Sequence, residues 1–214
     1  MMYSVSNWLA STREEHHRTF GVTVGVVTDN QDPDGMARVK VRFPWLGDSD
    51  ESFWARIVTP MAGNGRGLYC LPEVDDEVLV AFEHGAMDHA YVVGSLWNGS
   101  DSPPESNSDG HNNMRTLKSR SGHIIRLNDS NGSEKIEIID KTGSNKITIQ
   151  SSDNTLHIES DSDIQIQSST GKVVLSGVGI ELKSQAGVSV QANANIDVNA
   201  SGQLNLKGSL VNIN

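Results

Sequence analysis

The chain of 214 residues contains one cysteine, no proline after Pro104 and no aromatic residue after Trp97. The single Cys70 excludes an internal disulfide framework and a metal site built from several cysteines. No run of 18 apolar residues is present, and no apolar core of a signal peptide is found. We therefore expect synthesis in the cytoplasm without a signal peptide, and any action outside the cell would need a separate exporter.

A basic patch is also lacking. The formal net charge is −10, which argues against binding nucleic acid through the phosphate backbone. Arg38, Lys40 and Arg42 share one face of an expected strand, so a protein that binds oligonucleotides is the alternative to weigh. Its binding should appear at low salt and weaken steeply as salt is added. The charge balance favours no nucleic acid partner.

What the chain does contain is a repeat of about eight residues in its last third. Two apolar residues flank one polar residue, and successive pairs begin 11, 9, 8, 9, 7, 8, 8, 8 and 7 residues apart. The tenth pair is Val211/Ile213, and the first nine pairs, which we predict to form the core of a trimer, are Ile136, Ile138, Ile147, Ile149, Leu156, Ile158, Ile164, Ile166, Val173, Leu175, Ile180, Leu182, Val188, Val190, Ile196, Val198, Leu204 and Leu206.

This period predicts an architecture. Residues i and i+2 lie on the same face of a strand, and a fixed period means that each repeat stacks on the next. Eight residues are too few for one chain to close a coil, so we predict three intertwined chains, each giving one strand to each side of a triangular prism. The narrow axis suits Val, Ile and Leu, and the lack of proline suits an internal ladder. A β-sandwich is the alternative, but its core calls for larger residues and irregular spacing.

The rest of the chain divides by composition. We expect a short helix over residues 6–18 within an N-terminal segment 1–19. A barrel of the OB type follows over 20–99, with strands near 20–28, 36–44, 53–60, 68–72, 77–83 and 90–97. A polar linker covers 100–113, transition strands lie in 114–140, and the octad repeats fill 141–214. The predicted fold class is all-β, an N-terminal OB-fold barrel followed by an intertwined trimeric β-helix prism.

Candidate chemistry is sparse. His16-His17 and the pair His84/His89 lack the further ligands that a metal needs, and His157 should point outward. The loop with Asp29, Asp32 and Asp34 lacks the last glutamate of a calcium loop, so a hairpin turn is favoured. The glycine-rich turn 63–67 is not a phosphate loop. We predict no catalytic residues, no metal and no cofactor, although ions on a threefold axis stay open.

Several motifs in residues 38–99 resemble one known family. The strand RVKVRFPW, the strand WARI, the turn AGNGRG, the hairpin LPEVDDEVLVAFEHG and the closing VVGSLWNG occur in the order of the OB domain of VgrG proteins and phage baseplate protein V. Residues 119–149 are similar to the segment that leads into the family's β-helix. The resemblance covers nearly everything from about residue 20 to 214.

The resemblance implies a trimeric central spike of a contractile tail, which pierces the outer membrane of a target when the sheath contracts. It implies a bacterial cytoplasm as the place of synthesis and the virion or tail baseplate as the location. It also implies a tail hub partner, expected at Trp8, Leu9 and the barrel, and a PAAR-like tip partner at Val211, Asn212, Ile213 and Asn214. About 19 residues precede the barrel, so we expect the short phage form with a separate hub protein. No lysozyme domain fits the linker.

The alternative function is a trimeric tailspike or adhesin that binds or cleaves surface polysaccharide. Such a protein needs aromatic platforms for sugars and paired carboxylates. The octad region has no aromatic residue, and its acids, among them Asp153, Glu159 and Glu181, are typical of a solvated face. The sequence therefore favours a protein that is not an enzyme.

Overall fold

The computed structural model describes residues 19–47 and 51–213. Within these ranges every regular element is a strand except one 3-10 turn, η1 (Glu83–Gly85). The predicted all-β class and OB-type domain are confirmed. The expected helix over 6–18 lies outside the described residues, as do His16 and His17.

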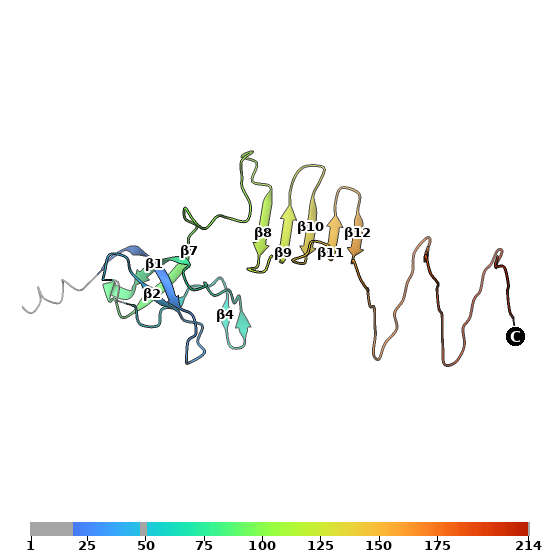
Figure 1. Cartoon of the computed structure of the whole chain (residues 1–214), viewed down its shortest axis with the longest axis horizontal. Coiled ribbons are helices and arrows are strands. Elements are labelled where there is room, and N and C mark those ends of the chain that lie inside the picture. The colour runs from blue at the N-terminus through green and yellow to red at the C-terminus, as the bar shows by residue number, and fades with distance from the viewer. Residues whose placement is uncertain (1–18, 48–50, 214) are drawn as a thin grey trace, which may run out of the picture. The chain divides into compact units, whose positions relative to one another are not determined.

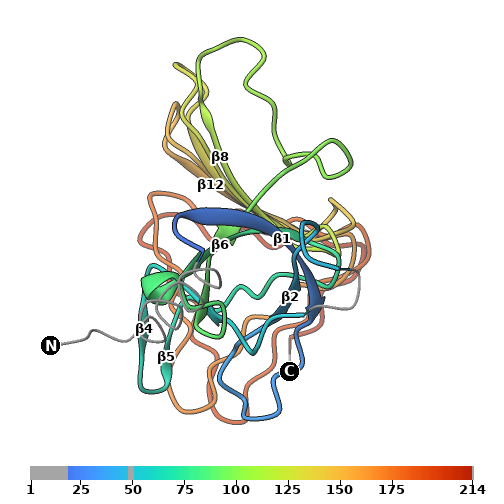
Figure 2. The same cartoon turned by 90° about the vertical axis from the view of Figure 1, so that its left-hand side faces the viewer.

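The first sheet has five strands in the order β2-β1-β6-β7-β3. Its strands are β1 (Val22–Asp29), β2 (Lys40–Arg42), β3 (Arg56–Ile57), β6 (Glu77–Phe82) and β7 (Ala90–Ser95). All neighbours are antiparallel except β3 and β7, which are parallel. Figure 2 shows these strands curving around a common centre.

The sheet closes on itself at its two outer strands. Val39, next to β2, and Ala55, next to β3, exchange both backbone hydrogen bonds, at 3.0 and 2.7 Å. A five-stranded closed sheet with one parallel pair is the arrangement of an OB barrel. Alternation along β6 points Val78, Val80 and Phe82 into the barrel. The other buried apolar side chains of the core are Val27, Val39, Val41, Phe43, Ala55, Ala90 and Val92.

Residues 68–72 were expected to form a strand, and this prediction is wrong. A small hairpin of β4 (Ala62–Gly63) and β5 (Arg66–Gly67) comes just before them instead. The apolar residues Leu-Tyr-Cys-Leu suggest a strand. However, the Leu68 carbonyl accepts a hydrogen bond from the Thr59 hydroxyl at 2.8 Å, and the Pro72 carbonyl accepts one from the side-chain amide of Asn30 at 3.1 Å. Side chains thus take up carbonyls that a ladder would use.

A second sheet of five strands follows the linker. It is an antiparallel meander of β8 (Met114–Lys118), β9 (Ile124–Asn128), β10 (Lys135–Ile139), β11 (Lys146–Gln150) and β12 (Thr155–Glu159) (Figure 1). We expected the transition strands to end at residue 140. From residue 141 onward we expected each chain to give one strand to each side of the trimeric prism. In the structure β11 and β12 continue the same sheet, because the longer early spacings leave room for chain reversal at turns such as Gly132 and Gly143, both with positive φ.

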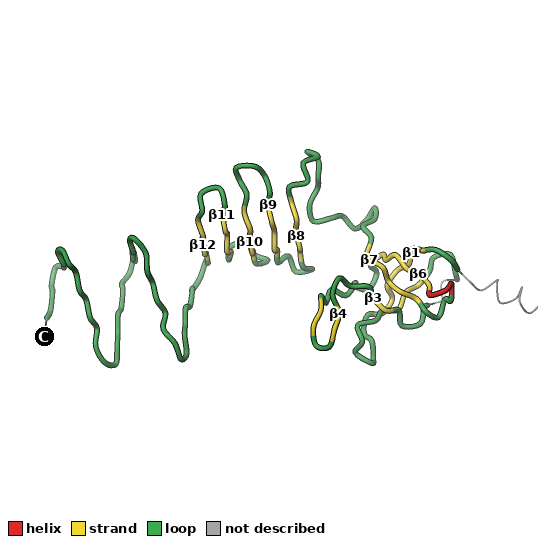
Figure 3. Tube along the Cα trace, turned by 180° about the vertical axis from the view of Figure 1, so that it is seen from behind, coloured by secondary structure: helices red, strands yellow, loops and turns green. Residues whose placement is uncertain are grey.

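Residues 162–213 form a separate compact unit, here called the octad segment. It contains no strand ladder with itself and runs in extended legs joined by turns, drawn as loop in Figure 3. The predicted triple-stranded prism therefore stays a prediction. No helix within 19–47 or 51–213 is long and apolar enough to cross a membrane.

Candidate functional site: an apolar sheet face and the octad segment

The strand register of the second sheet places its apolar residues on one face. Ile138 of β10 lies opposite Ile125 of β9 and Ile147 of β11. Two parallel rows of facing residues run across the five strands and make up what we call the apolar sheet face. The first row is Leu117, Ile125, Ile138, Ile147 and Ile158, and the second is Arg115, Leu127, Ile136, Ile149 and Leu156.

This face is uncovered in the single chain. Each of its nine apolar side chains is at least 40% exposed, and Leu156 reaches 62%. Monomeric soluble proteins rarely show contiguous apolar surface on this scale, and where they do it marks a contact site. The rows include the first three predicted core pairs, so the structure brings those six residues together on one surface.

The opposite face of the sheet has a polar central row, in which the buried carboxylate is paired with cations. Thr116, Arg126, Glu137, Thr148 and His157 form its central row. Glu137 is only 8% exposed, and its carboxylate lies 2.9 Å from the Lys135 ammonium and 3.8 Å from the Arg126 guanidinium. A buried carboxylate needs such partners, because an unpaired one would be costly. The buried charge of Glu137 is therefore balanced by cations of the same chain.

The linker contributes one carboxylate to the same network. Glu105 accepts a hydrogen bond from the Thr116 hydroxyl at 2.8 Å and forms an ion pair with Arg126 at 2.6 Å. The Thr116 hydroxyl and the Arg126 guanidinium hold the pKa of Glu105 below its usual value. The linker, which reads as unanchored in the sequence, is thus fixed to the polar face of the sheet.

A carboxylate also fixes the turn between β10 and β11. Asp140 accepts from the Thr142 hydroxyl at 2.7 Å and from the backbone and side-chain amides of Asn145, both at 3.2 Å. These bonds favour the charged form, so the pKa of Asp140 falls to about 2. The turn aligns Ile138 with Ile147 across the two strands.

The remaining predicted core residues lie in the octad segment and are exposed there. Their exposed fractions run from 52% at Val173 to 72% at Ile166 and Leu182. Few hydrogen bonds hold the turns, among them those in which the Ser184 hydroxyl bonds the backbone of Ala186 and Gly187. The single chain supplies the apolar pairs but not their cover.

The expected contact sites for partners are placed only in part. Val211, Asn212 and Ile213 are exposed, with Ile213 at 84%. Trp8, Leu9 and Asn214 lie outside the described residues. Sequence reasoning missed Leu117, Ile125 and Leu127, although Ile125 and Leu127 carry the same two-residue signal as the pairs that follow.

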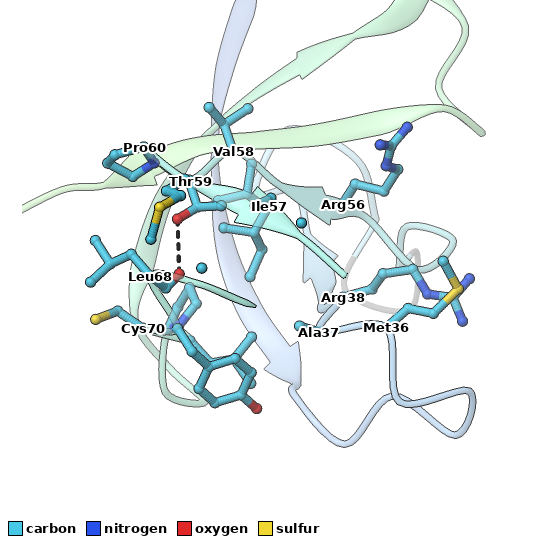
Figure 4. A pocket seen from close by; sticks show the side chains of 18 of the residues that line it. Met36, Ala37, Arg38, Arg56, Ile57, Val58, Thr59, Pro60, Leu68 and Cys70 are labelled. Atoms are coloured by element: carbon cyan, nitrogen blue, oxygen red, sulfur yellow. Dashed lines mark hydrogen bonds between the residues drawn. The ribbon is translucent and has the colours of Figure 1, made fainter. Parts of the chain in front are cut away.

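The barrel carries a shallow groove of about 850 Å³ between the loop before β2, strand β3 and residues 60–72 (Figure 4). Ile57 and Leu71 are among its apolar lining residues, and Figure 4 places Arg38 and Arg56 on one side of it and Leu68 and Cys70 on the other. No carboxylate or histidine belongs to the lining that the structure describes. Tyr69 and Cys70 are the lining residues whose side chains can exchange a proton near neutral or alkaline pH.

The acidic loop before the groove is a hairpin turn, as predicted. The Arg38 guanidinium forms an ion pair with Asp32 at 2.6 Å and another with Asp34 at 2.5 Å. The side chain of Asp32 is only 3% exposed. The guanidinium holds the pKa of Asp32 far below its usual value. Arg38 thus occupies the place between the carboxylates. No group of three or more metal-ligating side chains occurs in residues 19–47 and 51–213.

Comparison with known proteins agrees with this fold. Residues 23–97 match the model of the type VI secretion system/phage-baseplate injector OB domain. The matched residues are those of the barrel described above, which is thus similar to that family of OB domains. The resemblance to the VgrG and baseplate V spikes is confirmed.

Relatives of the chain are spike proteins of the type VI secretion system. VgrG3 of Vibrio cholerae is 28% identical over 122 residues, which cover 55% of this chain and 11% of the relative. VgrG4b of Pseudomonas aeruginosa is 32% identical over 48% of this chain and 14% of its own length. VgrG1a of Pseudomonas aeruginosa is 28% identical over 55% and 20%. The matched part thus spans a tenth to a fifth of these relatives.

Proposed function

We propose that the protein is the trimeric central spike of a contractile tail baseplate, which pierces the outer envelope of a target cell when the sheath contracts. The observation that carries this proposal is the uncovered apolar surface of the second sheet and the octad segment, in a chain whose barrel is similar to the injector OB domains. The spike is a mechanical part and not an enzyme.

The energy of burial supports the trimer. The eighteen predicted core side chains are all exposed in one chain, and burying each one contributes about 1.5–3 kcal/mol. Tens of kcal/mol per chain would be lost in a monomer. Three copies around one axis cover all of these residues with identical surfaces, as closed symmetry allows.

The extended legs of the octad segment support the prism. An isolated edge strand is a liability that proteins avoid, and here a whole segment has no ladder within its own chain. Two further chains would supply the missing hydrogen-bond partners. Continuous backbone ladders around an apolar axis give the stiffness that piercing requires.

The partners follow from this role. A tail hub protein would bind near the barrel and the N-terminal segment, and a PAAR-like protein would cap the end near Val211 and Ile213. The outer membrane is the target, and the assembled location is the virion or the injection apparatus. No observation on the groove or the octads favours cleavage of polysaccharide.

The first experiment is native mass by light scattering after size exclusion, with an unheated SDS gel. A species of about three chain masses that resists SDS is the expected result, because intertwined chains separate only when their ladders break. Its apex would then be pressed onto a supported lipid bilayer by force microscopy, with breakthrough before buckling expected. A monomer of 23.2 kDa would overturn the trimer and the piercing mechanism together.

A further inference from the structure

We propose that the apolar sheet face makes the first contact between copies of this chain and sets their register. The octad segments of the copies then associate with one another. This inference rests on the proposed trimer and concerns how it assembles. The two parts of the surface differ in a way that gives them different roles.

The sheet is organised before any partner arrives. Its five strands are hydrogen-bonded to one another within one chain. Glu105, Arg126 and Glu137 satisfy its polar face, and Asp140 fixes a turn. Binding by a preformed surface avoids much of the ordering cost of association, so this face can dock as it stands.

The octad segment is not organised in this way. It has no ladder of its own, and its core residues, such as Ile180 and Val188, are 59% and 63% exposed. Ordering each of its residues costs conformational entropy that only the completed interface repays. Contact between copies is therefore more costly to begin in the octad segment than on the sheet.

The octads also specify their register weakly. From Ile180 onward successive pairs begin 8, 8, 8 and 7 residues apart. A slip of one octad places Ile180 beside Val188 of a neighbouring copy, and the pairs that begin at 180, 188 and 196 then still face apolar pairs. Repetitive strands are prone to such slippage, so the register has to be fixed elsewhere.

The sheet face can fix it because it does not repeat in this way. Its pairs begin 11 and 9 residues apart. Arg115 ends the second row as its single charged member and is held by Asp129 at 2.8 Å. Docking three copies out of register would set this guanidinium against isoleucine or leucine, which is costly if it loses its solvation.

The occupant of the face is a second copy rather than a foreign protein. The face and the octad segment follow each other directly in the chain and carry the same alternation of apolar and polar residues. A foreign protein on the sheet would have to give way where the octads begin, whereas another copy covers both without a break.

The test uses the full chain and reads register directly. Cys70 is replaced by serine in two reporter proteins, one with Ile180→Cys and the other with Val188→Cys, and the two are mixed in denaturant so that any link between 180 and 188 joins two different chains. After refolding from denaturant, a short thiol cross-linker is added and the linked peptides are identified by mass spectrometry. Pairs joining 180 to 180 or 188 to 188 report the correct register, and pairs joining 180 to 188 report a slip.

Ile136→Ser with Ile138→Ser weakens the sheet face, and Leu204→Ser with Leu206→Ser is the matched control in the octads. We expect the reporter and control proteins to give like pairs in at least a roughly tenfold excess, and the sheet variant to lose most of that excess and trimerise more slowly. Equal effects of both variants, or a larger effect of the control, would overturn the inference while leaving the trimer intact. A reporter protein that stays monomeric would overturn the proposed trimer itself.

Discussion

Gly25 is the residue where barrel closure allows least room. A Cβ built there would overlap the Cγ1 of Val41 and lie 3.2 Å from the Arg42 carbonyl and 3.3 Å from the Phe43 ring. β1 and β2 cross so closely at this point that no side chain fits between them. The absence of a side chain is a condition of the fold at this position.

Gly25→Ala is therefore expected to destabilise the barrel by about 1–3 kcal/mol, the usual cost of overpacking a filled core. The melting temperature should fall by roughly 4–8 °C for each kcal/mol in a domain of this size. Tryptophan fluorescence follows the barrel, since three of the four tryptophans, Trp45, Trp54 and Trp97, lie between residues 20 and 99. Gly94→Ala is the control, because nothing lies within 4 Å of its added Cβ. Equal melting of both variants would refute the close approach.

At the scale of elements, alternation in the sequence locates the strands well. The expected strand 77–83 matches β6 and its inward residues Val78 and Val80. The expected strand 36–44 shortens to β2 because Ala37 takes a positive φ of 58° and Arg38 turns back to Asp32. A contact such as this one depends on how a loop folds, which the pattern of apolar residues does not encode.

The candidate site divides in the same way. Alternation shows which side of Ile136, Ile138, Ile147 and Ile149 is apolar, and the structure gathers them on one face. It does not show what covers that face, which in the proposed trimer is another copy of the chain. The anchoring of Glu105 by Arg126 joins residues 21 positions apart through polar groups, and no periodic signal marks it.

The turn between β10 and β11 should respond to acid. The pKa of Asp140 is lowered to about 2 from an ordinary value of 3.8. A lowered pKa contributes stability that is present above the ordinary value and is lost as the pH falls through about 2. Hydrogen exchange of the Asn145 amide should therefore accelerate, beyond the intrinsic pH dependence, between about pH 4 and pH 2.

Asp140→Asn should remove this pH dependence and leave the turn more open at neutral pH. Asp163→Asn is the control, because it removes the same charge from a residue of the octad segment that is not part of this turn. If Asn145 in the Asp140→Asn protein stays as protected as in the unchanged chain, the carboxylate does not hold the turn.

At the scale of the whole molecule, aromatic and aliphatic residues are distributed differently between the barrel and the octad segment. All Phe, Tyr and Trp side chains lie in the first 97 residues. The barrel core there includes Phe43 and Phe82, whose ring centroids are 5.5 Å apart. The apolar pairs of the octads are all aliphatic, as the narrow axis of the proposed trimer would demand. Asp197 lies between Ile196 and Val198, and in the proposed prism its carboxylate would point outward.

Val198→Asp adds a second carboxylate, at the position that faces inward in the proposed prism. In the proposed trimer it would bring three carboxylates together on the axis, where removal from water and mutual repulsion both oppose burial. We expect the SDS-resistant species to be lost and native mass to fall or become dependent on concentration. Barrel melting by tryptophan fluorescence should stay unchanged, because the barrel core is built from other residues.

Asn199→Asp, at the outward position, should keep the trimer. A Val198→Asp protein as resistant to SDS as the Asn199→Asp protein would mean that Val198 does not face the axis, and the prism model would have to be abandoned.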